Sequence, residues 1–111
     1  MTITLFSRDS RDTPIGSFSL PVVFGRSADA DVKLDDRWVS RKHCVIDQID
    51  GNLVLRDLNS THGTFVNREP VLEAILSPDD EISVGLNVFV VHWDHKLCDA
   101  FSADEAPSEV V

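Results

Sequence analysis

The sequence predicts an all-β fold, an antiparallel β-sandwich or barrel built from many short strands and without long helices. Short runs rich in β-branched and aromatic residues alternate with clusters of Gly, Pro, Asn and Asp, which is the pattern of strands joined by turns. Nowhere does a helical period of apolar residues persist for the roughly ten residues that a helix needs. At 111 residues, the chain has room for one domain with one core.

The first quarter of the chain is expected to form three strands. They are predicted at residues 3–6, 15–20 and 22–24, with the polar segment 8–14 as a hairpin loop between the first two. Pro21 permits only an edge strand or the start of a strand at its position, because proline has no backbone N–H. The third strand ends at Gly25, directly before Arg26.

The strongest local signal in the rest of the chain is a hairpin over residues 44–57, with Asp50-Gly51 at its tip. Further strands are predicted at residues 64–66, 81–84 and 87–93, with a turn at 67–70. Residues 71–76 are ambiguous and could form a helical turn. A domain over residues 1–95 is therefore expected, followed at 96–111 by an acidic, disordered tail rich in Ala, Ser, Pro and Glu.

The charges are distributed unevenly. The net charge of -9 argues against general nucleic-acid binding, which needs a broad basic face. One short segment nevertheless gathers five cations: Arg26, Lys33, Arg37, Arg41 and Lys42. Such a basic island suits one small anion held locally, although the same side chains could simply form a solvated face.

Compartment and redox chemistry follow from what the sequence contains. No apolar run approaches the roughly 18 residues of a membrane span, and the N-terminus has no signal-peptide pattern, so a cytoplasmic location is expected. Two cysteines, Cys44 and Cys98, are too few for a disulfide framework and are expected to be free, buried thiols.

Two polar loops carry the residues of greatest chemical interest, at 39–43 and 59–64. A phosphate dianion needs a guanidinium for charge, together with hydroxyl and backbone N–H donors for geometry. Arg26, Ser40, Arg41 and Thr61 supply these groups, and Gly63 allows the sharp turn that faces them outward. Loops distant in sequence meet at one end of an antiparallel sandwich, so these segments are expected to form one anion-binding surface.

The order and spacing of these motifs resemble the forkhead-associated (FHA) domain. The matching segments are Gly25-Arg26, residues 40–43 (SRKH), residues 57–67 (DLNSTHGTFVN) and residues 76–85 (LSPDDEISVG). Each motif is weak by itself, but the combination is specific, and the resemblance extends over residues 3–93.

This resemblance implies a sandwich of about eleven strands that binds phosphothreonine peptides, without catalysis, cofactor or metal. The implied partner is a phosphothreonine-containing protein, such as a serine/threonine kinase or its substrate, with no nucleic acid or membrane involved. Residues implied to bind the phosphopeptide are Arg26, Ser40, Arg41, Thr61 and His62. Residues implied to support the site structurally are Gly25, His43, Gly63 and Asn67.

Three positions depart from the family pattern. His62 stands where the family most often has Asn, which changes the expected contact to the peptide main chain. Arg68 replaces a common Gly after Asn67, so a turn of a different type is expected there. Asp79 also stands where Gly is usual.

The same residues also permit other interpretations. Ser40 and His43 could form a nucleophile and base, but no acid or oxyanion hole is evident. His92, His95 and Cys98 have the spacing of zinc ligands, without a second ligand cluster. Trp38 is expected to be exposed, Trp93 and the phenylalanines buried. A phospho-independent interaction or assembly module remains the alternative function.

Overall fold

The computed structural model describes residues 2–93, which form a β-sandwich of eleven strands. The predicted all-β class is confirmed: no helix occurs between Thr2 and Trp93. The strands are β1 (Thr2–Ser7), β2 (Ser10–Ser19), β3 (Val22–Gly25), β4 (Val32–Lys33), β5 (Cys44–Ile49), β6 (Asn52–Asp57), β7 (Thr64–Val66), β8 (Glu69–Val71), β9 (Glu73–Ile75), β10 (Glu81–Val84) and β11 (Asn87–Trp93).

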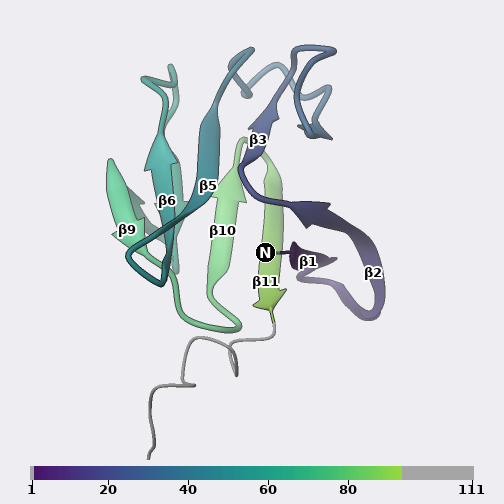
Figure 1. Ribbon diagram of the computed structural model, residues 1–111. Helices are drawn as coiled ribbons and strands as arrows, with labels where there is room; N and C mark the ends of the chain where they lie inside the picture. The colour runs from purple at the N-terminus through teal and green to yellow at the C-terminus, as the bar shows by residue number, and fades with distance from the viewer. Residues whose placement is uncertain (1, 94–111) are drawn as a thin grey trace, which may run out of the picture.

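The strands form two sheets that pack face to face (Figure 1). One sheet has the order β2-β1-β11-β10-β7-β8, and the other has the order β4-β3-β5-β6-β9. The short β4 runs parallel to β3, while the other pairs in the described range are antiparallel. Pro14 and Pro70 lie on β2 and β8, the two edge strands of the larger sheet. Proline is tolerated on an edge strand because its missing N–H can face solvent instead of a neighbouring strand.

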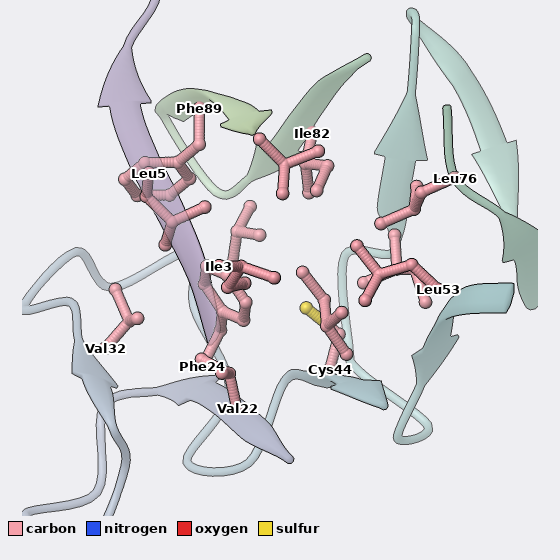
Figure 2. Packing of buried hydrophobic residues seen from close by; sticks show 14 of the residues in the cluster. Ile3, Leu5, Val22, Phe24, Val32, Cys44, Leu53, Leu76, Ile82 and Phe89 are labelled. Carbon is pink, nitrogen blue, oxygen red and sulfur yellow. The ribbon is translucent and has the colours of Figure 1, made fainter. Parts of the chain in front are cut away.

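The core lies between the sheets and is filled by alternate residues of the central strands (Figure 2). Phe24 and Phe89 meet across it with ring centroids 5.7 Å apart. Trp93 is buried, as predicted, and so is the Cys44 thiol. Cys98, the other cysteine predicted to be a free, buried thiol, lies outside the described residues.

Two local predictions were wrong, and one ambiguous segment proves to be a strand. The strand β2 begins at Ser10, within the predicted loop 8–14, and β8 begins at Glu69, within the predicted turn. Residues 73–75 form β9 on β6 and not a helical turn. All three strands lie at sheet edges, where backbone pairing with one neighbour suffices and the side chains need not be apolar.

The topology collects the loops of interest at one end of the sandwich. Strand β5 is antiparallel to both β3 and β6, so the chain after β3, before β5 and after β6 reaches the same end. Figure 1 shows these loops at the top of the molecule, beside the turn from β10 to β11. The predicted tail at 96–111 lies outside the described residues. Within the described part of the chain, no helix is long and apolar enough to cross a membrane.

Candidate functional site

The loop that contains Ser40 lies directly against the end of β3. The backbone N–H of Arg26 donates to the carbonyl of Ser40 at 3.0 Å, and Ser27 donates to the carbonyl of Arg41 at 3.1 Å. A Cβ atom on Gly25 would lie 2.0 Å from the carbonyl oxygen of Arg41, which is a severe overlap. Glycine is therefore required at position 25, because the backbone of the loop occupies the space of a side chain.

His43 is buried and joins the two loops. Its Nδ1 accepts a hydrogen bond from the backbone N–H of Ser40 at 3.1 Å, and its Nε2 lies 2.8 Å from the carbonyl oxygen of Gly63. A backbone N–H can only donate and a carbonyl can only accept, so the proton of the neutral ring is on Nε2. Both ring nitrogens are therefore used to hold backbone groups.

The hydroxyl of Ser40 is oriented by the second loop. Its oxygen accepts a hydrogen bond from the backbone N–H of Thr61 at 3.0 Å, which leaves the hydroxyl hydrogen for a further acceptor. The half-buried Ser40 is thus a donor at the junction of the two loops. The nitrogens of His43 bond to backbone groups of Ser40 and Gly63 and not to this hydroxyl, which gives no support to a serine nucleophile.

Asp57 organises the second loop from beneath. Its carboxylate accepts hydrogen bonds from the backbone N–H of Ser60 at 3.0 Å, from the Ser60 hydroxyl and from the Thr64 hydroxyl at 2.6 Å. Burial raises the pKa of Asp57, but these hydrogen bonds outweigh burial and the pKa lies below its ordinary value. The Ser60 hydroxyl in turn accepts from the N–H of Gly63 at 3.0 Å.

Asp57 was not predicted from the sequence as part of the site. The available signal was a carboxylate followed three and seven residues later by hydroxyls, a spacing that permits local capping of a turn. Positive backbone φ angles at Asn59 (62°) and Gly63 (88°) complete the compact loop. The predicted sharp turn at Gly63 is therefore present.

Asp36 fixes the first loop and was also missed. One carboxylate oxygen accepts from the backbone N–H of Trp38 at 2.8 Å, and the other from the N–H of Leu86 at 2.6 Å. Gly85, with φ of 63°, would place a Cβ only 2.6 Å from the side chain of Val39. The turn from β10 to β11 is thus packed closely against the loop that carries Ser40.

The outward face of the site is cationic. Arg26, Arg41, Thr61 and His62 are exposed, and within residues 2–93 neither arginine forms an ion pair. Lys33, another member of the basic island, pairs with Asp35 at 3.8 Å. Both arginines are thus available to an anion.

An aromatic contact links the two loops on this face. Trp38 is 39% exposed, as predicted, and its ring lies edge-on to the ring of His62 with centroids 4.8 Å apart. The guanidinium of Arg37 lies 5.6 Å from the Trp38 ring. His62, which stands where the family most often has asparagine, is therefore packed against Trp38.

Asn67 does not touch these loops. It lies at the opposite end of β7 from Gly63, where its side chain bonds to Asp80 at 3.1 Å and to the N–H of Glu81 at 3.0 Å. Any support that it gives to the site acts through β7. Asn67 and Arg68 have φ angles of 50° and 72°, and positive φ at both positions is typical of a two-residue type I′ turn. Arg68 therefore adopts the left-handed conformation that glycine favours.

The three residues with the spacing of zinc ligands are only partly described. His92 is exposed on β11, whereas His95 and Cys98 lie outside the described residues. Between Thr2 and Trp93, no group of three or more His, Cys, Asp or Glu side chains could hold a metal ion.

The family model for the FHA domain matches residues 22–85, more than half of the chain. The chain belongs to the FHA domain family. Its match includes both loops, Arg26 and Gly85, so the family assignment rests on the same segments that form the site.

Curated relatives share this FHA region. The oxoglutarate dehydrogenase inhibitor of Corynebacterium diphtheriae is 43% identical over 61 residues, which are 55% of this chain and 43% of that protein. The glycogen accumulation regulator GarA of Mycolicibacterium smegmatis is 44% identical over 61 residues, 55% of this chain and 39% of that protein. The matched region therefore spans about four-tenths of the length of these relatives.

Solved FHA domains share the fold over most of the chain. A structure from a study of phosphothreonine-dependent FHA domain interactions has a TM-score of 0.73 and 34% identity, and it covers 85% of this chain and 98% of its own. The N-terminal FHA domain of S. cerevisiae Rad53p, in complex with a phosphothreonine peptide, has a TM-score of 0.76 and 26% identity. That match covers 91% of this chain and 100% of the Rad53p chain.

Proposed function

We propose that this FHA domain is a phosphothreonine-dependent protein interaction module, and that it binds rather than transforms its ligand. The observation that carries the proposal is the convergence of three segments on Ser40. Its carbonyl accepts from the N–H of Arg26, and its hydroxyl accepts from the N–H of Thr61, each at 3.0 Å. These backbone contacts support the proposal because they bring residues with a cationic and with hydroxyl side chains together from separate parts of the chain.

Each group on this face has a role that suits a doubly charged phosphate. Arg26 and Arg41 supply charge-assisted hydrogen bonds, which are stronger than neutral ones. The Ser40 hydroxyl donates its free hydrogen, and Thr61 lies beside it to donate or to contact the threonine methyl group. The net charge of -9 on the whole chain limits binding of anions elsewhere.

His62 is proposed to bind the main chain of the peptide. Its ring can donate a hydrogen bond in place of the family's asparagine, and Trp38 restricts the positions that the ring can take. The loops of the site are proposed to be held in place by Gly25, His43 and Gly63. Asn67 is proposed to support them indirectly, through strand β7.

The proposed partner is a phosphorylated protein, such as a serine/threonine kinase or a kinase substrate. The cytoplasmic location expected from the sequence is part of the proposal. The curated relatives are named as an inhibitor and as a regulator of metabolism. A regulatory role for this chain, exerted through binding to a phosphorylated partner, is part of the proposal.

The test uses a degenerate peptide library with one fixed phosphothreonine, from which a binding sequence is selected. Isothermal titration then compares that peptide with its phosphoserine and unmodified forms. We expect binding to require the phosphate, and phosphoserine to bind about fourfold more weakly because one methyl group is left unburied. Equal binding of the phosphorylated and unmodified peptides would instead favour a phospho-independent interaction module.

A further inference from the structure

A hollow of about 410 Å³ lies on the side of the second loop that faces strand β8. One wall is the loop itself, at residues 59–63, and the other consists of Pro70, Val71 and Leu72. Leu72 is 82% exposed, the largest exposed fraction of any large apolar residue in the described chain. An apolar wall open to water beside a polar loop is characteristic of a binding surface.

Both walls are fixed to one framework. The backbone N–H of Asp57 donates to the carbonyl of Leu72 at 2.9 Å, and Thr64 pairs with Val71 across the ladder between β7 and β8. The hollow is therefore formed before any ligand arrives, and a ligand would not have to order it.

The hollow suits an apolar group better than a basic one. Asp57 is a carboxylate in its lining, but that carboxylate already accepts hydrogen bonds from Ser60 and Thr64. Little of its capacity is left for a cation from outside. Besides the polar loop residues, the hollow offers a ligand the apolar wall of Pro70, Val71 and Leu72.

The hollow is continuous with the proposed phosphate site. Thr61 and His62 line the hollow, and the N–H of Thr61 is also bonded to the Ser40 hydroxyl at 3.0 Å. An extended peptide advances about 3.3 Å per residue, so a chain that crosses the tip of this loop reaches the hollow within a few residues.

The geometry points to a second subsite: the hollow binds an apolar side chain of the phosphorylated segment, within about three residues of the phosphothreonine. This inference rests on the proposed function. The occupant is part of the same ligand, because the two surfaces share Thr61 and His62. Leu72 would then be a specificity-determining residue of this domain.

The experiment scans each position near a fixed phosphothreonine with Leu and Ala, and measures dissociation constants by fluorescence anisotropy. We expect the native domain to prefer Leu at one position by about 3- to 10-fold, the effect of partly burying its additional carbons. The variant Leu72→Ser should reduce that preference to within about twofold and leave the affinity for the Ala peptide unchanged. Its side chain is exposed, so folding should be unaffected.

The matched control is Ile75→Ser. Ile75 lies on the neighbouring strand β9, is 66% exposed and does not line the hollow, so this variant should retain the native preference. Phosphate-dependent binding without any apolar preference would overturn the subsite alone, as would a preference that survives Leu72→Ser. Absence of phosphate-dependent binding would overturn the proposed function and the subsite together.

Discussion

The Nε2 atom of His43 donates to the carbonyl oxygen of Gly63, twenty residues further along the chain, at 2.8 Å. The opposite ring nitrogen accepts the backbone N–H of Ser40 at 3.1 Å. One buried side chain therefore sets the separation of the two loops that form the proposed phosphate-binding surface. A buried histidine therefore shapes the site without contact to a ligand.

Replacement of His43 should destabilise the fold. In His43→Leu, the Ser40 N–H and the Gly63 carbonyl lose their partner in a buried setting, and we expect the free energy of unfolding to fall by about 2–4 kcal/mol. Urea denaturation measures this change. The control His92→Leu alters an exposed histidine and should shift stability by less than about 0.5 kcal/mol. A similarly small change for His43→Leu would contradict the assigned role.

Removal of the guanidinium at position 26 should weaken binding far more than it weakens folding. Arg26→Ala deletes a charge-assisted hydrogen bond to an anion, and we expect a loss of about 2–4 kcal/mol of phosphopeptide binding by titration calorimetry. Arg56→Ala, an exposed arginine on β6, is the control and should leave the dissociation constant unchanged. An unchanged constant for Arg26→Ala would refute its assignment as a phosphate ligand.

The close approach at Gly25 predicts a clear difference between two glycine variants. Gly25→Ala forces the Cβ against the carbonyl of Arg41, so the loop must move. We expect the free energy of unfolding to fall by about 1–3 kcal/mol and the phosphopeptide affinity to fall roughly tenfold or more. Gly51→Ala places its Cβ in open space at a turn far from the site. That variant should reduce stability through its positive φ and leave affinity intact. Equal affinities of the two variants would argue against the close approach as a requirement for binding.

The pH dependence of stability should include a contribution from Asp57. Its pKa in the folded state lies below the ordinary 3.8, so the carboxylate form is favoured by folding. This stabilisation is complete above the ordinary pKa and is lost as the pH falls below it, through the folded value. The difference in unfolding free energy between the native chain and Asp57→Asn should be constant above about pH 5 and shrink in acid. A difference independent of pH down to about pH 2 would contradict this linkage.

Asp79 offers a stabilising substitution. Its φ of 71° is strained for a residue with a Cβ, so Asp79→Gly should raise the free energy of unfolding by about 0.5–1 kcal/mol. The backbone N–H of Asp79 bonds to the carbonyl of Val91 at 3.0 Å, and glycine retains that bond. Asp79→Ala keeps the strain and should show no gain in thermal or urea denaturation. A gain of equal size in the alanine variant would rule out backbone strain as the cause.

Much of the fold could be predicted because its signals are local. The hairpin at Asp50-Gly51 has φ angles of 53° and 82°, the positive values that a two-residue hairpin turn requires and that Asp-Gly pairs commonly supply. Strands β3, β5 and β11 carry apolar residues that only a core can bury. The starts of the edge strands β2 and β8 were missed and β9 was left ambiguous, because the pairing of an edge strand is decided by its neighbour and not by its own composition.

By itself, the sequence determined the all-β class and the residue types of the site, since strand and turn preferences and the chemistry of arginine and serine belong to single residues. Only the tertiary structure decided that Asn67 lies away from the site, that Asp36 and Asp57 hold its loops, and that Trp38 packs on His62. These relationships depend on the register of strands paired across long stretches of chain. A hydrogen bond or ring contact between distant residues exists only once that register places the atoms within a few ångströms of each other.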